Sequence, residues 1–175
     1  MIGCMSCWIR CTMDPDLRTG QPVEVDLVPA TAGERAVLWS MMREELADQF
    51  ERITQVLGLS WEEFEAHYAT RGEVCTLCRG GEVAGYCWIE LRERELHLHA
   101  IMVLPGQRGR GIGSAALRRL EAEFRDHADV IELGVSHDNP RARSLYERVG
   151  FVVVTTLHDV GYDIMRKPLT EVPLA

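Results

Sequence analysis

The stretch from Ile101 to Ser114, I-M-V-L-P-G-Q-R-G-R-G-I-G-S, constrains the fold of this chain more than any other. An apolar run ends at Pro105, three glycines follow at alternate positions up to Gly113, and apolar residues then recur at helical spacing. The pattern predicts a strand, a glycine turn and the start of a helix. Glycine backbone and the unpaired N–H groups of a helix N-terminus together form an anion site, most often for phosphate. We therefore expect a phosphorylated ligand here.

Two arginines, Arg108 and Arg110, flank this turn in a chain of 175 residues whose formal net charge is -8. Local positive charge on an acidic background favours an anionic ligand, and the acidic balance argues against nucleic acid as a partner. No apolar run approaches the roughly 18 residues of a membrane helix. The first ten residues lack the basic and apolar regions of a secretory signal. We expect a cytoplasmic protein, away from membranes, with reduced cysteines.

Three kinds of phosphate-binding turn share this outline. A Walker P-loop requires Lys and then Ser or Thr after its last glycine, but Ile112 and Gly113 stand there, which excludes it. A dinucleotide fingerprint fits Gly111, Gly113 and Ala116, with Glu132 as the acid for the ribose. The third kind is recognised only together with the rest of the chain.

The rest of the pattern predicts one mixed α/β domain over residues 22–170, followed by a short tail, 171–175. Alternating or continuous apolar runs predict strands at 23–28, 74–79, 81–91, 95–104, 130–135, 151–156 and 162–166. Capping signals and apolar stripes predict helices over about 31–50, 60–72, 114–128 and 139–150. Short turns join the second, third and fourth strands, so these should form an antiparallel meander.

Residues 1–21 are interpreted as a disordered N-terminal extension. Cys4 and Cys7 form a C-x2-C pair, and Cys75 and Cys78 would complete a zinc arrangement. However, the second pair lies in an expected strand, where an offset of three residues directs the two side chains to opposite faces. We therefore expect no metal.

Two motifs carry a family resemblance. R-G-R-G-I-G at 108–113 fits the signature Q/R-x-x-G-x-G/A, and N-P-R-A-R-S-L-Y-E-R-V-G-F at 139–151 fits N-x-x-A-x-x-L-Y-x-x-x-G-F at every fixed position. With this order of elements, residues 95–167 resemble the GNAT superfamily of acyl-CoA-dependent N-acetyltransferases. The resemblance implies a central, mostly antiparallel sheet of about seven strands flanked by about four helices. The dinucleotide alternative expects its glycines after the first strand of a parallel series, and it leaves Asn139 and Tyr146 unexplained.

The resemblance implies transfer of an acetyl group from acetyl-CoA to a primary amine of a small molecule or peptide. In such enzymes the backbone of the fourth strand binds the pantetheine arm and polarises the thioester carbonyl, which maps onto Ile101, Met102 and Val103. Asn139 matches a pantetheine contact. Backbone N–H groups of the turn would hold the pyrophosphate; the residues are Arg108, Gly109, Arg110, Gly111, Ile112, Gly113 and Ser114.

The resemblance also implies an acid, whereas the base is where this chain departs from its relatives. Tyr146 matches the family's general acid, and packing on the core is its alternative role. Many protein-acetylating members carry a glutamate where Gly134 stands, and other members carry one where His97 stands. His97 and His99 alternate with Ile101 and Val103 onto one strand face. An imidazole near pKa 6.5 suits proton transfer, so we expect His97 or His99 to be the base; two structural histidines are the alternative.

The acceptor is not determined by the sequence. The first two helices carry acidic residues that fit either a rim for cationic amines or a solvated helix face; they are Glu44, Glu45, Asp48, Glu51, Glu62, Glu63 and Glu65. The oligomeric state is open, with a homodimer as one option. Two other classes remain as alternatives, namely an acyl-CoA-binding module without turnover and a nucleotide-binding oxidoreductase domain.

Overall fold

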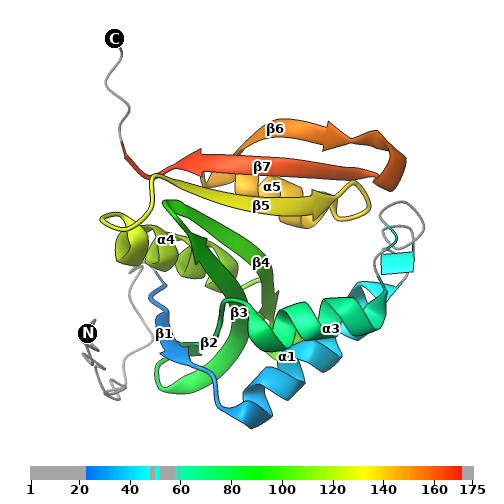
Figure 1. Cartoon of the computed structure of the whole chain (residues 1–175). Coiled ribbons are helices and arrows are strands. Elements are labelled where there is room, and N and C mark those ends of the chain that lie inside the picture. Colours follow the sequence, from blue (N-terminus) through cyan, green and yellow to red (C-terminus); the bar gives the residue numbers. More distant parts are fainter. Residues whose placement is uncertain (1–22, 48–49, 52–57, 59, 171–175) are drawn as a thin grey trace, which may run out of the picture.

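The computed structural model describes residues 23–47, 50–51, 58 and 60–170, and one sheet of seven strands runs through them in the order β1-β2-β3-β4-β5-β7-β6 (Figure 1). The strands are β1 (Asp26–Pro29), β2 (Glu73–Arg79), β3 (Glu82–Arg92), β4 (Glu95–Val103), β5 (Val130–Ser136), β6 (Val152–Leu157) and β7 (Tyr162–Pro168). Every neighbouring pair is antiparallel except β4 and β5, which are parallel. The predicted sheet is thus confirmed.

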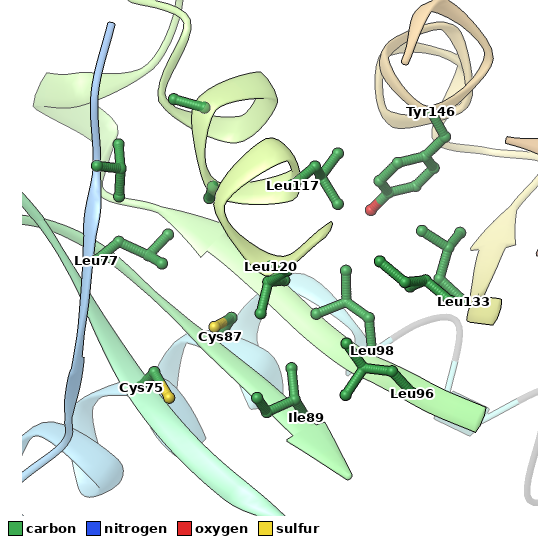
Figure 2. Packing of buried hydrophobic residues seen from close by; sticks show 14 of the residues in the cluster. Cys75, Leu77, Cys87, Ile89, Leu96, Leu98, Leu117, Leu120, Leu133 and Tyr146 are labelled. Atoms are coloured by element: carbon green, nitrogen blue, oxygen red, sulfur yellow. The ribbon is translucent and has the colours of Figure 1, made fainter. Parts of the chain in front are cut away.

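Helices cover both faces of this sheet. The described α-helices are α1 (Ala32–Glu45), α3 (Trp61–Thr70), α4 (Ile112–Phe124) and α5 (Pro140–Arg148), with short 3-10 turns at Pro105–Gln107 and His158–Val160. None of them is long and apolar enough to cross a membrane. The larger apolar core lies on the face covered by α4 and α5, and it contains Leu117, Leu133 and Tyr146 (Figure 2). A smaller core on the other face joins α1 and α3 to the sheet through Leu38 and Trp88.

Local side chains determine where α1 begins, whereas tertiary packing determines the chain that follows it. Thr31 and Glu34 form the predicted capping box, with the Thr31 hydroxyl accepting from the Glu34 N–H at 3.3 Å. α1 ends at Glu45, before the predicted end at about residue 50, because the backbone leaves the helical region at Leu46 (φ -106°, ψ 3°). Ala47, Phe50 and Glu51 are helical again. Phe50 is nevertheless buried, and its ring stacks on that of Trp61 at 3.8 Å between centroids. The apolar stripe therefore continues past the interruption at Leu46, and its last member is buried against α3.

Two further boundaries differ from the prediction for reasons of pairing. β1 begins at Asp26 rather than at Val23, because its ladder to β2 starts where Asp26 meets Cys78. Val23 lies instead beside Gly111 at the start of α4, which begins at Ile112 rather than at Ser114.

A β-bulge in β4 corrects the expected alternation of His97, His99, Ile101 and Val103. Trp88 of β3 pairs with Ala100, and the next residue, Ile89, pairs with Leu98, so His99 is an extra residue in the ladder. After this insertion the parity of the strand reverses. The two histidines share the face of α1 and α3 with Trp88, whereas Ile101 and Val103 pack against the larger core. The four side chains therefore do not line one face.

Candidate active site

The parallel strands β4 and β5 pair only near their beginnings. The register runs from Glu95 opposite Val130 to Leu98 opposite Leu133, and beyond this point the strands part. In Figure 1 the two halves of the sheet spread apart there. The opening forms a pocket of about 500 Å³. Because a strand edge without a neighbour has no ladder partner for its backbone groups, this wall offers N–H and C=O groups to a ligand.

The pocket is lined from both faces of the sheet and combines residues far apart in sequence. Its lining comprises Met42, Glu45 and Leu46 around the end of α1, His99 to Met102 of β4, Gly134 to Ser136 of β5, Asp138, Asn139, Ala142 and Tyr146 of α5 and its preceding turn, and Tyr162 of β7. Five of the residues predicted from the sequence meet here: His99, Ile101, Met102, Asn139 and Tyr146. Val103, His97 and the residues of the glycine turn, 108–114, are not among the lining residues.

The glycine turn leaves the N-terminus of α4 open. Gly109 and Gly111 adopt positive φ angles of 76° and 79°, a left-handed conformation that favours glycine. Gly111 is the N-cap, and it brings no side chain that could accept from the first turn. The first intrahelical bond runs from the Ala115 N–H to the Gly111 carbonyl at 3.0 Å. The N–H groups of residues 112–114 precede this bond and have no acceptor within the helix, so they are available as donors to an anion.

The arginine side chains contribute less to this turn than the sequence suggests. The Arg108 guanidinium is directed away from it, donating to the Val103 carbonyl at 2.9 Å and to the carboxylate of Glu45. The Val103 carbonyl is therefore occupied, and the charge of Arg108 is paired. Arg110 remains at the turn, donating to the side chain of Gln107 at 3.3 Å. The hydrogen-bond donors of the glycine turn are thus mainly backbone N–H groups.

Tyr146 combines the two roles that the sequence left open. Its ring packs in the larger core, with the centroid 5.9 Å from that of Phe151, and Figure 2 shows it reaching from α5 toward Leu117. The side chain also lines the pocket. Burial raises the pKa of the Tyr146 phenol well above its ordinary value of 10, so the hydroxyl stays protonated at neutral pH. A buried, protonated phenol at the pocket can donate a proton.

The start of α5 is fixed by the side-chain amide of Asn139 and by the carboxylate of Asp163. Asn139 is the N-cap, and its Oδ1 accepts from the Ala142 N–H at 3.1 Å, which leaves the amide Nδ2 as a donor. One turn later Arg143 pairs with the buried carboxylate of Asp163 on β7. Asp163 also accepts from Thr156 at 2.7 Å and contacts His137 at 3.1 Å. The helix that carries Tyr146 is therefore tied to β6, β7 and the turn after β5.

His99 lines the pocket on the face of α1 and α3. Its ring lies 4.3 Å from that of Trp88, and its Nε2 lies 2.9 Å from a carboxylate oxygen of Glu90. Burial lowers the pKa of His99, against the opposing effect of Glu90. The ring is therefore neutral at pH 7. If its Nε2–H donates to Glu90, Nδ1 is left as a proton acceptor.

His97 lies at the other end of the parallel pair, away from the pocket. Its Nδ1 is 3.2 Å from the carboxylate of Glu132, which also binds Arg166. The residues around it form a separate hollow between the β3–β4 turn and the start of β5. Of the two predicted bases, only His99 is placed beside Tyr146 and Asn139.

Tyr162 is a pocket residue that reasoning from the sequence missed. A Cβ at position 134 would overlap Cε1 of its ring and lie 3.1 Å from Cδ1. The tyrosine ring thus fills the space beside β5 that a glutamate side chain at position 134 would occupy. A lone glycine in the apolar run V-I-E-L-G-V was the available signal, since a strand glycine often marks a close approach.

Two of the acidic residues on the first two helices have partners within the protein. Glu45 lines the pocket but is paired with Arg108, and Glu63 is used in the capping box of α3, where its N–H donates to Ser60 at 3.1 Å. Asp48 lies outside the described residues. Two of these acidic side chains are thus engaged by neighbouring groups of the protein.

The zinc arrangement involves residues that the structure describes only in part. Cys75 is buried in the larger core opposite Cys87 of β3, and Figure 2 shows both thiols inside it. Cys75 and Cys87 are not joined by a disulfide. Cys4 and Cys7 fall in 1–22, outside the described part of the chain.

Comparison with solved structures shows the same fold at low sequence identity. The ribosomal-protein-S18-alanine N-acetyltransferase from Escherichia coli matches with a TM-score of 0.58 at 20% identity, covering 85% of this chain and 96% of that chain. An acetyltransferase from Salmonella typhimurium, solved with its cofactor acetyl-CoA, matches with a TM-score of 0.60 at 19% identity, again covering 85% and 96%.

Curated relatives match over part of their length. The N-alpha-acetyltransferase RimI from Mycobacterium tuberculosis is 42% identical over 78 residues, which are 41% of this chain and 47% of that protein. The mycothiol acetyltransferase from Kineococcus radiotolerans is 34% identical over 80 residues, 46% of this chain and 26% of that protein. The chain thus spans from about a quarter to about half the length of these two relatives.

A family model matches more of the chain than either of these curated relatives does. The model of the acetyltransferase (GNAT) family aligns with residues 38–151, from α1 to the end of α5. This range includes the glycine turn, the parting of β4 and β5, and the helix of Asn139 and Tyr146. The dinucleotide alternative is wrong, because the glycine turn follows an antiparallel meander. The chain belongs to the GNAT acetyltransferase family.

Proposed function

We propose that this protein is an N-acetyltransferase that moves an acetyl group from acetyl-CoA to a primary amine. The observation that carries the proposal is the pocket between β4 and β5, which brings free strand backbone, Asn139, Tyr146 and His99 around one space. The turn after β4 leads to the open N-terminus of α4. Family membership and the acetyl-CoA complex of a structural relative support the same assignment.

Acetyl-CoA fits the polar groups that the site presents, and when bound it supplies an activated acetyl thioester. The N–H groups of residues 112–114 and the turn at Gly109 and Gly111 would hold its pyrophosphate. Asn139 Nδ2 and the free edge of β4 at Ile101 and Met102 would hydrogen-bond the amide groups of the arm. These contacts would hold the pantetheine arm along the free edge of β4.

His99 and Tyr146 would move the two protons of the reaction. The amine nitrogen must be neutral to attack, so His99 accepts its proton, directly or through water. The C–N bond then forms, the C–S bond breaks with its electron pair leaving on sulfur, and the Tyr146 hydroxyl donates its proton to that sulfur. The positively charged amide nitrogen releases its second proton, which returns through water to the Tyr146 phenolate, and His99 passes the first proton to solvent. The two groups belong to opposite faces of the sheet, with Tyr146 among α4 and α5 and His99 beside Trp88. We assign the base to His99 rather than to His97.

The acceptor is a primary amine of a small molecule or a peptide. Among structural relatives of the same fold are an alanine N-acetyltransferase of a ribosomal protein and a spermidine N-acetyltransferase solved with CoA and spermine, which cover both kinds. We further propose that residues 22–170 form the catalytic domain, with 1–21 and 171–175 outside it. The free thiols in the core support a cytoplasmic location.

The test is a panel of amines offered with acetyl-CoA, followed by release of free thiol and by mass spectrometry of the product. The panel includes polyamines, amino acids and short peptides with different N-terminal residues. Acetylated amine formed in step with thiol is the expected result. Binding of acetyl-CoA without product from any amine would favour an acyl-CoA-binding module instead.

A further inference from the structure

We propose that Tyr162, seated on Gly134, is the residue that positions the acceptor amine by hydrogen-bonding it through its phenol oxygen. The inference rests on the proposed function and adds a specificity-determining contact to it. Neither composition nor motif spacing points to Tyr162, because it follows Asn139 by more than twenty residues and lies on a different strand.

The first argument is steric. The Tyr162 ring occupies the position of a Cβ at residue 134, with Cζ 3.2 Å from that point. Any side chain at 134 would displace the ring. Gly134 is thus the seat of the tyrosine, and the absence of a carboxylate there does not leave the pocket without a polar group.

The second argument is the face of the sheet on which Tyr162 lies. Ser136 pairs directly with Tyr162, and opposed residues of antiparallel strands share a face. Leu133 and Val135 point into the core under α4 and α5, so Gly134, Ser136 and Tyr162 belong to the opposite face. This is also the face of His99 and Trp88.

The third argument is the direction of attack. The phosphate-binding turn and Tyr146 lie on the side of α4 and α5, so an acyl carrier bound to them enters the parted strands from that side. The amine must then approach the carbonyl carbon from the remaining side, where His99 and Tyr162 line the pocket. A phenol on that side meets the acceptor rather than the leaving sulfur.

The fourth argument is preorganisation. On one side of Tyr162, the Gly161 carbonyl accepts from the His137 N–H at 2.9 Å. On the other side, the Asp163 carboxylate is held by Thr156, His137 and Arg143. The backbone of Tyr162 is therefore fixed on both sides and its ring is fixed by Gly134. Among the described residues the Tyr162 hydroxyl has no hydrogen-bond partner. A rigid phenol with a free oxygen is suited to orient a ligand.

The test is a double-mutant cycle on the full-length protein with the best amine of the panel. Tyr162→Phe keeps the ring and removes one hydrogen bond, so KM for the amine should rise about 10-fold, while kcat and KM for acetyl-CoA change less than about twofold. Gly134→Ala should give at least the same rise, because its Cβ displaces the ring. In the double mutant, Gly134→Ala should add almost nothing to Tyr162→Phe.

Controls separate this inference from folding and from the proposed function. Gly106→Ala, at a glycine with no heavy atom within 4 Å of the added Cβ, should leave all constants unchanged, and thermal melting checks that each variant folds. An unchanged KM for the amine in Tyr162→Phe, a loss confined to kcat, or additive effects in the cycle would overturn the inference. If wild type binds an amine in the presence of CoA without acetylating it, the enzymatic function fails, and the dissociation constant of that amine replaces KM in the same cycle. If no amine binds, the inference fails as well.

Discussion

The N-termini of α1 and α4 solve the same chemical problem in opposite ways. At α1, Thr31 and Glu34 satisfy each other's backbone groups, with the Thr31 N–H donating to the Glu34 carboxylate at 2.8 Å. At α4, the N-cap is Gly111, and the donors of the first turn are left open. The α3 N-terminus repeats the first solution with Ser60 and Glu63. A closed helix end stabilises the fold, whereas an open one binds an anion.

The same contrast extends to the two faces of the parted sheet. The face of α4 and α5 presents backbone donors and a buried phenol, which suit a carrier common to the whole family. The face of α1 and α3 is built from rings that contact one another, from Trp39 and Tyr68 to Trp88 and His99. We infer that the first face fixes the carrier and the second fixes the acceptor, and the following variants test that division.

Tyr146→Phe should have the largest effect on activity. Loss of a general acid costs about 10²–10⁴-fold in rate, and we expect kcat to fall about 10²-fold because water partly replaces the phenol. The dissociation constant of acetyl-CoA should stay the same, since the ring and its packing remain. Because the pKa of this phenol is raised, wild type should show no loss of activity from its ionisation up to pH 10. Steady-state kinetics and calorimetry measure both quantities.

The matched control for this variant is Ser144→Ala, at an exposed position of the same helix, which should change kcat little. A Tyr146→Phe protein with nearly full kcat would assign Tyr146 to packing alone.

His99→Gln should have the next largest effect, and one that depends on pH. At pH 7, kcat/KM should fall by about 10–10²-fold, and the loss should shrink at high pH, where the amine is neutral by itself. Because burial lowers the pKa of His99, the acidic limb of the wild-type profile should lie below the ordinary value of 6.5 and disappear in the variant. The pH profile of kcat/KM is the measurement.

The sign of this shift also predicts the stability of the fold. A lowered pKa means that the unfolded chain binds a proton at position 99 more readily, so wild type loses stability as pH falls below 6.5. His97→Gln is the matched control on the same strand and should keep the wild-type pH–rate profile. If His97→Gln moves the limb and His99→Gln does not, the assignment of the base is reversed.

Gly109→Asp should weaken the carrier face alone. Asp tolerates the left-handed conformation of Gly109, and the position is open, so the fold should survive. A carboxylate beside a phosphate costs on the order of 1–2 kcal/mol at an exposed site, which corresponds to about a 10-fold weaker affinity for acetyl-CoA. KM for the amine should not change.

The control for this variant is Gly109→Asn, which has nearly the same shape and tolerates the same backbone conformation without the charge. Equal affinities of the Asp and Asn variants for acetyl-CoA would show that the pyrophosphate does not bind at this turn.

Thr31→Ala should have the smallest effect and should act on stability alone. Loss of an N-cap side chain costs about 1 kcal/mol, or roughly 2–4 °C in Tm for a domain of this size. Hydrogen bonds from Thr31 hold the pKa of Glu34 below its ordinary value of 4.5, so this contribution is present above that pH and is lost as pH falls further. The difference in Tm between wild type and variant should therefore narrow in acid. Thr31→Ser keeps the capping oxygen and should melt like wild type; a matching loss there would exclude capping as the cause.

Much of the carrier face could be predicted because it is local in sequence. It comprises two local features, the turn at Gly109 and Gly111 and the helix start at Asn139 and Pro140. Each feature depends on residues that lie within one helical turn of one another in the sequence. Backbone conformation and capping are decided over that distance. The end of α1 could not be predicted in this way, since Phe50 keeps its periodicity by packing on Trp61 of another helix.

By itself, the sequence determined the order of strands and helices, the meander of β2 to β4, the open N-terminus of α4 and the family. Only the tertiary structure decided which histidine lies at the pocket, because the bulge at His99 changes the parity of β4 through its pairing with β3. It also decided that Arg108 is directed toward Glu45 and that the ring of Tyr162 rests on Gly134. The last two contacts join residues that are 28 or more positions apart. All three depend on how the strands pair and part rather than on any local pattern.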